Sequence, residues 1–181
     1  PPGHGFPLWY QDLNGLTLDL CLPNASDPGN LQGAICLMET LPPYTFPGSF
    51  PGESFYFRGT ADLPLPGGMR AVFVSAVEAA FASGETAAGN DGVVFTRLRV
   101  TAGLPEPGEY LFYHPWGVHA ETVDFTTGAR DVFWTEDVGI GAPLDYSLAL
   151  RSQFGPYLQA SATPGGAPLP PVSVNGALFL A

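Results

Sequence analysis

The sequence predicts an all-β protein, built as an antiparallel β-sandwich with long Pro- and Gly-rich loops and at most one or two short helices. Two observations carry this prediction. Gly (23) and Pro (20) fill 43 of the 181 positions and are spread along the whole chain. Between them lie short apolar runs that alternate with period two, which is typical of strands. With 45% hydrophobic residues the chain can bury one sizeable core.

The N-terminal part divides into an arm, strands and a covering loop. The breaker-rich arm 1–12 must cover this domain's edge or a neighbouring molecule with its apolar side chains, Phe6, Leu8, Trp9 and Tyr10. Asn14-Gly15 then turns the chain into a strand over 15–22, and a second short strand is expected near 34–39. The loop 41–52 carries three aromatic residues and is expected to pack over one end of the sandwich.

The central part carries the longest strands. Alternation over 53–63 points Phe55 and Phe57 inward and Tyr56 outward. The run 69–81 is apolar on both faces and indicates a central strand, although its second half, SAVEAAFA, also suits a helix. Turn signals and further apolar runs predict strands at 93–103, 108–114, 119–125 and 129–138, one short helix near 143–153, and a last strand at 172–180.

The domain organisation follows from these elements. One β-sandwich core is expected over residues 13–159, after the N-terminal arm. The Pro- and Gly-rich stretch 160–171 is typical of a linker, and a C-terminal strand is expected over 172–181.

Cys21 and Cys36 are the two cysteines, and we expect them to form a disulfide. Their spacing matches neither a zinc knuckle nor a CxxC redox motif. In GLTLDLCLP the leucines share one face and Cys21 lies on the other, which favours a local bridge over one through the sandwich centre. The bridge would contribute about 3 kcal/mol and would indicate an oxidising compartment. Two unpaired buried thiols are the alternative.

The charge pattern excludes several partners. The chain has a formal net charge of −11 with six arginines and no lysine, so nucleic acid and anionic membranes are poor partners. It contains no apolar run of about 18 residues, so no membrane insertion is expected. The first residues are PPGHG, which fits an exported protein of the cell surface or medium whose signal peptide was removed, or a chain trimmed for expression.

GLPEPGEYLFYH resembles the strand-entry motif of fibronectin type III and related immunoglobulin-like bacterial domains. There a leucine, a Pro-Gly turn and a tyrosine lead into a core strand. The resemblance implies an immunoglobulin-like sandwich with a tyrosine corner, in which the tyrosine hydroxyl bonds nearby backbone, formed by Leu104, Pro107, Gly108 and Tyr110. The spacing departs from the family, because fibronectin modules usually have one residue more between the glycine and the tyrosine.

Four further stretches, FPLWYQDLNGLTLDLCL, AVEAAF, YHPWG and FWTEDVG, are together similar to a group of secreted and surface proteins of high-GC bacteria. The resemblance implies a location and an architecture, and it implies no activity.

Few residues suggest chemistry. His114, His119 and Asp124 would bind a metal ion if the intervening turn brought them together, and ordinary surface histidines are the alternative. The loops NASDPGN and GNDG offer Asp27 and Asp91 as candidate calcium ligands. Motifs for zinc proteases, haem attachment and phosphate-binding loops are absent, so no other cofactor is expected.

Two aromatic residues and one acidic residue have open interpretations. Trp116 and Trp134 are candidates for stacking on a sugar ring, and packing within the protein is the alternative. Glu78, inside an apolar run, is a carboxylate at a sheet edge, a carboxylate paired with arginine, or a site residue.

Three classes of function remain. The arm and the terminal strand favour a non-enzymatic extracellular structural protein, which self-assembles into a surface filament or layer by engaging a neighbouring copy. The alternative is a carbohydrate- or ligand-binding module of a secreted or surface protein. Scattered carboxylates are the only support for a hydrolase, so no enzyme is expected.

Overall fold

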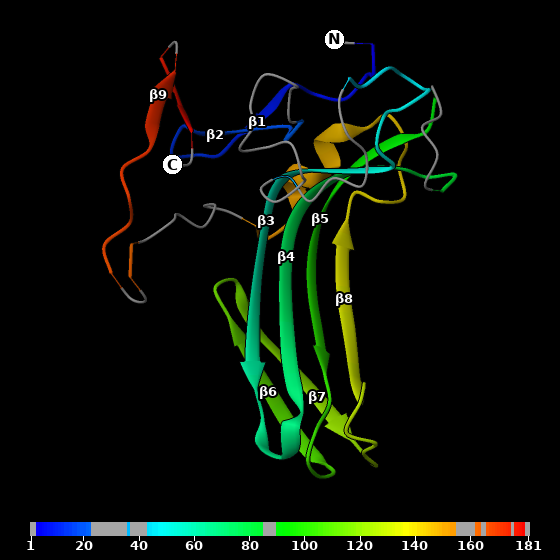
Figure 1. Cartoon of the computed structure of the whole chain (residues 1–181), viewed down its shortest axis with the longest axis vertical. Helices are drawn as coiled ribbons and strands as arrows, with labels where there is room; N and C mark the ends of the chain where they lie inside the picture. Colours follow the sequence, from blue (N-terminus) through cyan, green and yellow to red (C-terminus); the bar gives the residue numbers. More distant parts are fainter. Residues whose placement is uncertain are drawn as a thin grey trace.

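The computed structural model describes residues 3–22, 36, 43–84, 90–154, 162–163, 166–174 and 176–179. The regular structure of the described chain is strand, apart from two short 3₁₀ helices, and its sheets form a sandwich-like arrangement (Figure 1), which confirms the predicted fold class. The elements are β1 (Trp9–Gln11), β2 (Leu16–Asp19), β3 (Glu53–Pro64), η1 (Pro66–Gly68), β4 (Arg70–Phe81), β5 (Gly92–Ala102), β6 (Gly108–His114), β7 (Gly117–Val123), β8 (Val132–Val138), η2 (Tyr146–Arg151), β9 (Val172–Val174) and β10 (Ala177–Phe179). Within this described part no helix is long and apolar enough to span a bilayer.

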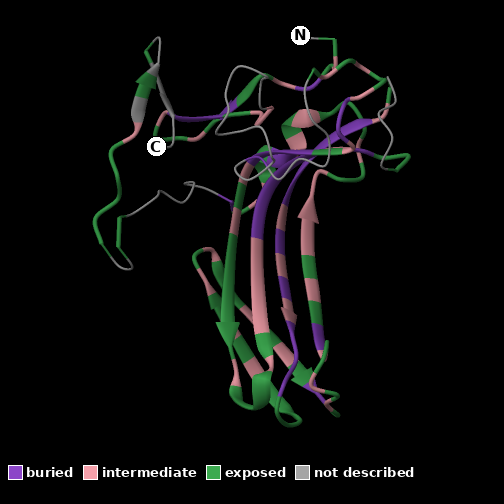
Figure 2. Cartoon of the chain, in the orientation of Figure 1, coloured by how far each residue is buried: buried purple, intermediate pink, exposed green. Residues whose placement is uncertain are grey.

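The largest sheet is antiparallel, with the strand order β3-β4-β5-β8. β4 is one continuous strand that pairs with β3 and β5 along nearly its whole length, so the helical alternative for SAVEAAFA is not adopted. Side chains on both faces of β4 are buried near its C-terminal end, as Figure 2 shows, which explains why the run is apolar on both faces.

The hairpin of β6 and β7 covers the other end of this sheet. Its Val123 packs in a small core with Val100, Leu104 and Val132. β7 begins at Gly117, two residues earlier than predicted, because the turn consists of only Pro115 and Trp116 and pairing resumes directly after it.

A tyrosine hydroxyl and a carboxylate fix the loops beside this hairpin. The Tyr110 hydroxyl donates a hydrogen bond of 2.6 Å to the Glu106 carbonyl oxygen, as a tyrosine corner requires. The Asp131 carboxylate accepts N–H hydrogen bonds from Leu104, Thr127 and Gly128 at 2.7, 2.6 and 3.0 Å. These bonds, the one from Leu104 foremost, lower the pKa of Asp131 to about 2.

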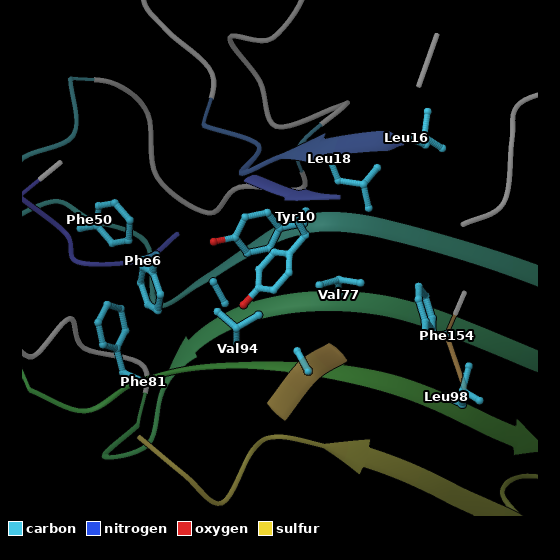
Figure 3. Packing of buried hydrophobic residues seen from close by; sticks show 13 residues of the cluster. Phe6, Tyr10, Leu16, Leu18, Phe50, Val77, Phe81, Val94, Leu98 and Phe154 are labelled. Carbon is cyan, nitrogen blue, oxygen red and sulfur yellow. The ribbon is translucent and has the colours of Figure 1, made fainter. Parts of the chain in front are cut away.

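A second, four-stranded sheet of order β1-β2-β10-β9 lies across the opposite end (Figure 1), and β2 and β10 pair in parallel. The predicted arm belongs to this layer and to the core beneath it. Phe6 is 1% exposed and Tyr10 is buried, and both pack with Phe50, Val77 and other residues of the main core (Figure 3). Of the two alternatives for the arm, Phe6 and Tyr10 therefore cover their own domain, and the assembly role expected for these two residues is not adopted.

The first half of β3 departs from simple alternation. A register shift between Phe55 and Phe57 marks a β-bulge. The bulge turns Tyr56 into the core, where it is 5% exposed and its hydroxyl donates a 2.6 Å hydrogen bond to the Pro7 carbonyl oxygen. The prediction that Tyr56 faces outward is therefore wrong.

The disulfide between Cys21 and Cys36 is present, with 5.3 Å between the two Cα atoms, which confirms that prediction. The strand expected near 34–39 lies outside the described residues except for Cys36. The single strand expected at 172–180 is instead two strands, β9 and β10, joined by a turn at Gly176 and paired antiparallel. The assignment of 160–171 as a linker stays a prediction.

The 126–131 turn lies close to the backbone of Gly103, at the end of β5. A substitution at Gly103 tests this close approach. A Cβ atom at Gly103 would collide with the backbone of Gly128 and Ala129, which cannot move as a side-chain tip can. Gly103→Ala is therefore expected to lower the free energy of unfolding in urea by about 2 kcal/mol or more. Gly141→Ala is the matched control, because nothing lies within 4 Å of its Cβ position, and equal losses in both variants would contradict the packing described here.

Candidate functional site

A pocket of about 480 Å³ opens between the β1–β2 turn, η2 and the inner face of the central sheet. We call it the turn pocket. Its described lining combines apolar and uncharged polar side chains, with Asp12 as its carboxylate. The lining residues are Tyr10, Gln11, Asp12, Leu13, Asn14, Val77, Thr96, Ala149, Leu150, Ser152, Gln153 and Phe154.

Local hydrogen bonds hold the two walls of the turn pocket in place. The Asp12 Oδ1 atom accepts hydrogen bonds from the N–H groups of Asn14 and Leu16 at 2.8 and 2.9 Å, which closes the β1–β2 turn. The Tyr10 hydroxyl donates a 2.8 Å hydrogen bond to the Tyr146 carbonyl oxygen and so ties β1 to η2. Both walls are thus fixed relative to the core.

The floor of the turn pocket is apolar except for one hydroxyl. Val77, Ala149 and Phe154 are buried core residues, and two of them are visible with Tyr10 in Figure 3. Thr96 of β5 is 4% exposed, and its Oγ1 atom has no hydrogen-bond partner in the structure. A buried hydroxyl left unpaired costs about 1–3 kcal/mol, so a ligand that bonds to it would recover part of that cost.

The rim of the turn pocket carries planar amides. Gln11, Asn14 and Gln153 are exposed there and can both donate and accept hydrogen bonds. The Gln11 amide already donates to the Gly15 carbonyl oxygen and the Thr17 hydroxyl at 3.1 and 3.3 Å. Amides around an apolar floor suit a neutral ligand that has hydroxyl groups and an apolar face.

Four charged residues form a second feature on the opposite, outer face of the sheet. Arg97 binds Asp137 through two hydrogen bonds of 2.8 and 2.9 Å, and it donates a third, of 3.2 Å, to Glu78. We call these three residues and Glu53 the charged cluster. A smaller pocket of about 290 Å³ is lined by Glu53, Glu78, Arg97 and nearby apolar residues.

Glu78 is the most buried member of the charged cluster, at 2% exposed. Burial is the main cause that raises the pKa of its carboxyl to about 7, and the carboxylates of Glu53 and Asp137 add to it against the opposing effect of Arg97. The structure thus places Glu78 beside Arg97, as the arginine-paired interpretation requires, and also at a pocket.

The predicted stacking residues are covered by other rings. Trp116 stacks on Phe154 with ring centroids 4.6 Å apart, and Trp134 stacks on His119 at 4.2 Å. His114 also lies against Trp134. These aromatic rings form a layer between the central sheet and the β6–β7 hairpin, which favours packing over sugar stacking.

The predicted metal sites find little support. His119 contacts the Glu121 carboxylate at 2.9 Å, and within the described part of the chain no three His, Cys, Asp or Glu residues are grouped to hold a metal ion. The Asp91 carboxylate accepts a hydrogen bond from the Ser83 N–H at 2.9 Å. Asp27 lies outside the described residues, so calcium binding there stays a prediction.

The sequence patterns did not predict the turn pocket. Asp12 and Asn14-Gly15 carry a clear turn signal, but nothing local indicates that this turn meets residues 149–154. The Thr96 hydroxyl gave no signal either, because threonine is common in strands.

Comparison with known proteins gives one kind of match. A stretch of 63 residues, 33% of the chain, matches fungal proteins. In this stretch the chain is 43% identical to the probable beta-galactosidase B of Aspergillus terreus and to that of Penicillium rubens, and 41% identical to that of Emericella nidulans. The match covers only 6% of the length of each fungal protein. No family model and no solved structure matches the chain.

The raised pKa of Glu78 predicts a pH dependence of stability. Between pH 4.5 and about pH 7 the unfolded chain releases the Glu78 proton while the folded chain keeps it. This group therefore lowers the free energy of unfolding as pH rises through that window, by up to about 3 kcal/mol. In Glu78→Gln this part of the decrease is expected to vanish in urea unfolding measured from pH 4 to 8.

The exposed Glu109→Gln variant is the control for this measurement, and its profile should follow that of the unmodified chain. If Glu78→Gln also shows the unmodified profile, the carboxyl of Glu78 does not carry its proton to neutral pH in the folded protein.

Proposed function

We propose that the chain is a carbohydrate-binding β module of an exported protein, and that the turn pocket holds the sugar. The observation that carries the proposal is the Thr96 hydroxyl, which lies unpaired on the floor of a pocket that is apolar below and lined by amides at its rim. The matched stretch of the fungal beta-galactosidases supports a role connected with carbohydrate.

The chemistry of a sugar ring suits this pocket. The C–H groups of a pyranose face can pack against the apolar surface of Tyr10, Leu150 and Phe154, and its hydroxyls can bond to the amides of Gln11 and Gln153. A neutral sugar is also unaffected by the net charge of −11, which acts most strongly against extended polyanions.

An exported location is part of the proposal. The Cys21–Cys36 disulfide is compatible with an oxidising compartment. The match to a short stretch of much longer proteins supports the role of a module.

Binding of β-galactosides tests this proposal. Lactose and galactose are expected to bind in calorimetric titrations, and Thr96→Val to weaken binding about five- to tenfold, since one hydrogen bond is worth about 1 kcal/mol. The folded state should keep its stability, because the lost hydroxyl has no partner in the structure. Thr101→Val, a hydroxyl on the outer face of the same strand, is the matched control.

Three outcomes would contradict the proposal. The first is that neither lactose nor galactose binds. The second is that Thr96→Val binds the sugar as tightly as the unmodified chain does. The third is that the chain hydrolyses an aryl β-galactoside. The last result would make it an enzyme, and loss of turnover in Glu78→Gln would assign the chemistry to the charged cluster.

Self-association is a second candidate function, favoured by β1. This strand lies at the edge of its sheet, and Leu8 and Trp9 are 57% and 51% exposed beside it. An open edge with exposed apolar side chains suits strand pairing with a second copy, as a surface filament or layer requires. The exported subunit would then polymerise through β1 while Phe6 and Tyr10 stay in the core.

Light scattering and electron microscopy test this second candidate. The unmodified chain is expected to form oligomers or polymers, and the Leu8→Ser, Trp9→Ser double variant to stay monomeric. Leu13→Ser is the control, because Leu13 is fully exposed on the adjacent turn. A monomeric unmodified chain would exclude assembly by this edge.

A further inference from the structure

Two arginines converge on one phenyl ring on the outer face of the central sheet. The Arg130 and Arg99 guanidinium carbons lie 3.8 and 5.2 Å from the centroid of the Phe133 ring. Among the described residues the ion pairs are made by Arg70, Arg97 and His119, so neither of these two arginines has a carboxylate partner there. The chain has six arginines against 17 carboxylates, which makes two unpaired guanidinium groups on one ring unusual.

The fold holds both arginines in place. Arg99 lies in β5 opposite Thr135 of β8, and Phe133 lies opposite Thr101 in the same ladder. Arg130 precedes Asp131, whose carboxylate is occupied by the N–H groups of the 127–131 turn and of Leu104. Asp131 therefore fixes the turn that presents Arg130 and is engaged elsewhere as an acceptor.

The Arg99 side chain has an unused donor. Its Nε atom is buried and has no hydrogen-bond partner in the structure. A buried donor on a charged group is costly when it is left unpaired. Because the Nε atom is screened from solvent, a ligand would bind at the outer nitrogens of the half-buried guanidinium, whose planar fork suits two oxygens of one anion.

The guanidinium groups of Arg99 and Arg130 also repel one another. Burial lowers the pKa of Arg99, and the positive charges of Arg97 and Arg130 lower it further, while Asp137 and Glu78 act in the opposite direction. Arg97 is paired with Glu78 and Asp137, so of these three guanidinium groups Arg99 and Arg130 are the two without a carboxylate partner among the described residues. An oxyanion bound between these two would remove their mutual repulsion.

We propose that Arg99 and Arg130 form a binding site for a single oxyanion group, a carboxylate or a sulfate, carried by a small ligand. The net charge of −11 repels extended polyanions, so the site suits one isolated anionic group, such as that of a uronic acid or a sulfated sugar. This inference stands apart from the turn pocket, which lies on the other face of the sheet.

Titration with two simple anions tests the site. Sodium sulfate and sodium glucuronate, at ionic strength matched with sodium chloride, are followed by amide chemical shifts of the full chain. At least one of them is expected to give saturable shifts around residues 99, 130 and 133, and Arg130→Gln to weaken that binding about tenfold or more. A response to only one anion identifies which kind of group the site takes.

Arg58→Gln is the matched control, because Arg58 also lies over a phenyl ring, that of Phe55, at 5.3 Å, but without a second arginine on it. It should bind as the unmodified chain does. Arg130 is exposed, so its replacement tests the site even if Arg99→Gln does not fold. Absence of saturable shifts with both anions, or equal weakening in Arg58→Gln and Arg130→Gln, would overturn the proposal.

Discussion

The pairing of β4 with β3 and β5 along nearly its whole length is the constraint on which the rest of the structure depends. Because neighbouring residues of a strand point to opposite faces, one strand supplies both candidate sites. Val77 forms part of the floor of the turn pocket, and the next residue, Glu78, lies in the charged cluster behind it. A shift of β4 by one residue would therefore disrupt both sites together.

The loops that complete the sites are held by single polar groups. Tyr10 packs edge-on against Tyr56, with ring centroids 4.7 Å apart, and its hydroxyl fixes η2. At the opposite end of the central sheet, the Asp131 carboxylate accepts hydrogen bonds from the N–H groups of Thr127 and Gly128 and so fixes the turn that carries Arg130. In each case one side chain from a regular part of the fold orients an irregular segment, so the site geometry is set by few hydrogen bonds.

Sequence patterns predicted the features that depend on residues close together in the chain. Alternation and turn residues gave the long strands, and the motif around Tyr110 gave the hydrogen bond to the Glu106 carbonyl oxygen. The burial of Phe6 and the inward turn of Tyr56 could not be predicted, because the first depends on a distant core and the second on a bulge. The turn pocket was missed for the same reason, since its two walls are separated by about 140 positions in the chain.

The parallel pairing of β10 with β2 has a consequence for the order of folding. Leu16 and Thr17 meet Leu178 and Phe179, so this contact joins segments that lie almost a whole chain apart. Closing so long a loop is entropically costly and slow compared with forming the hairpins of the central sheet. We therefore expect β2 to gain its second neighbour last, after the central sheet has formed. During synthesis, one edge of β2 then stays open until residues 177–179 have been made.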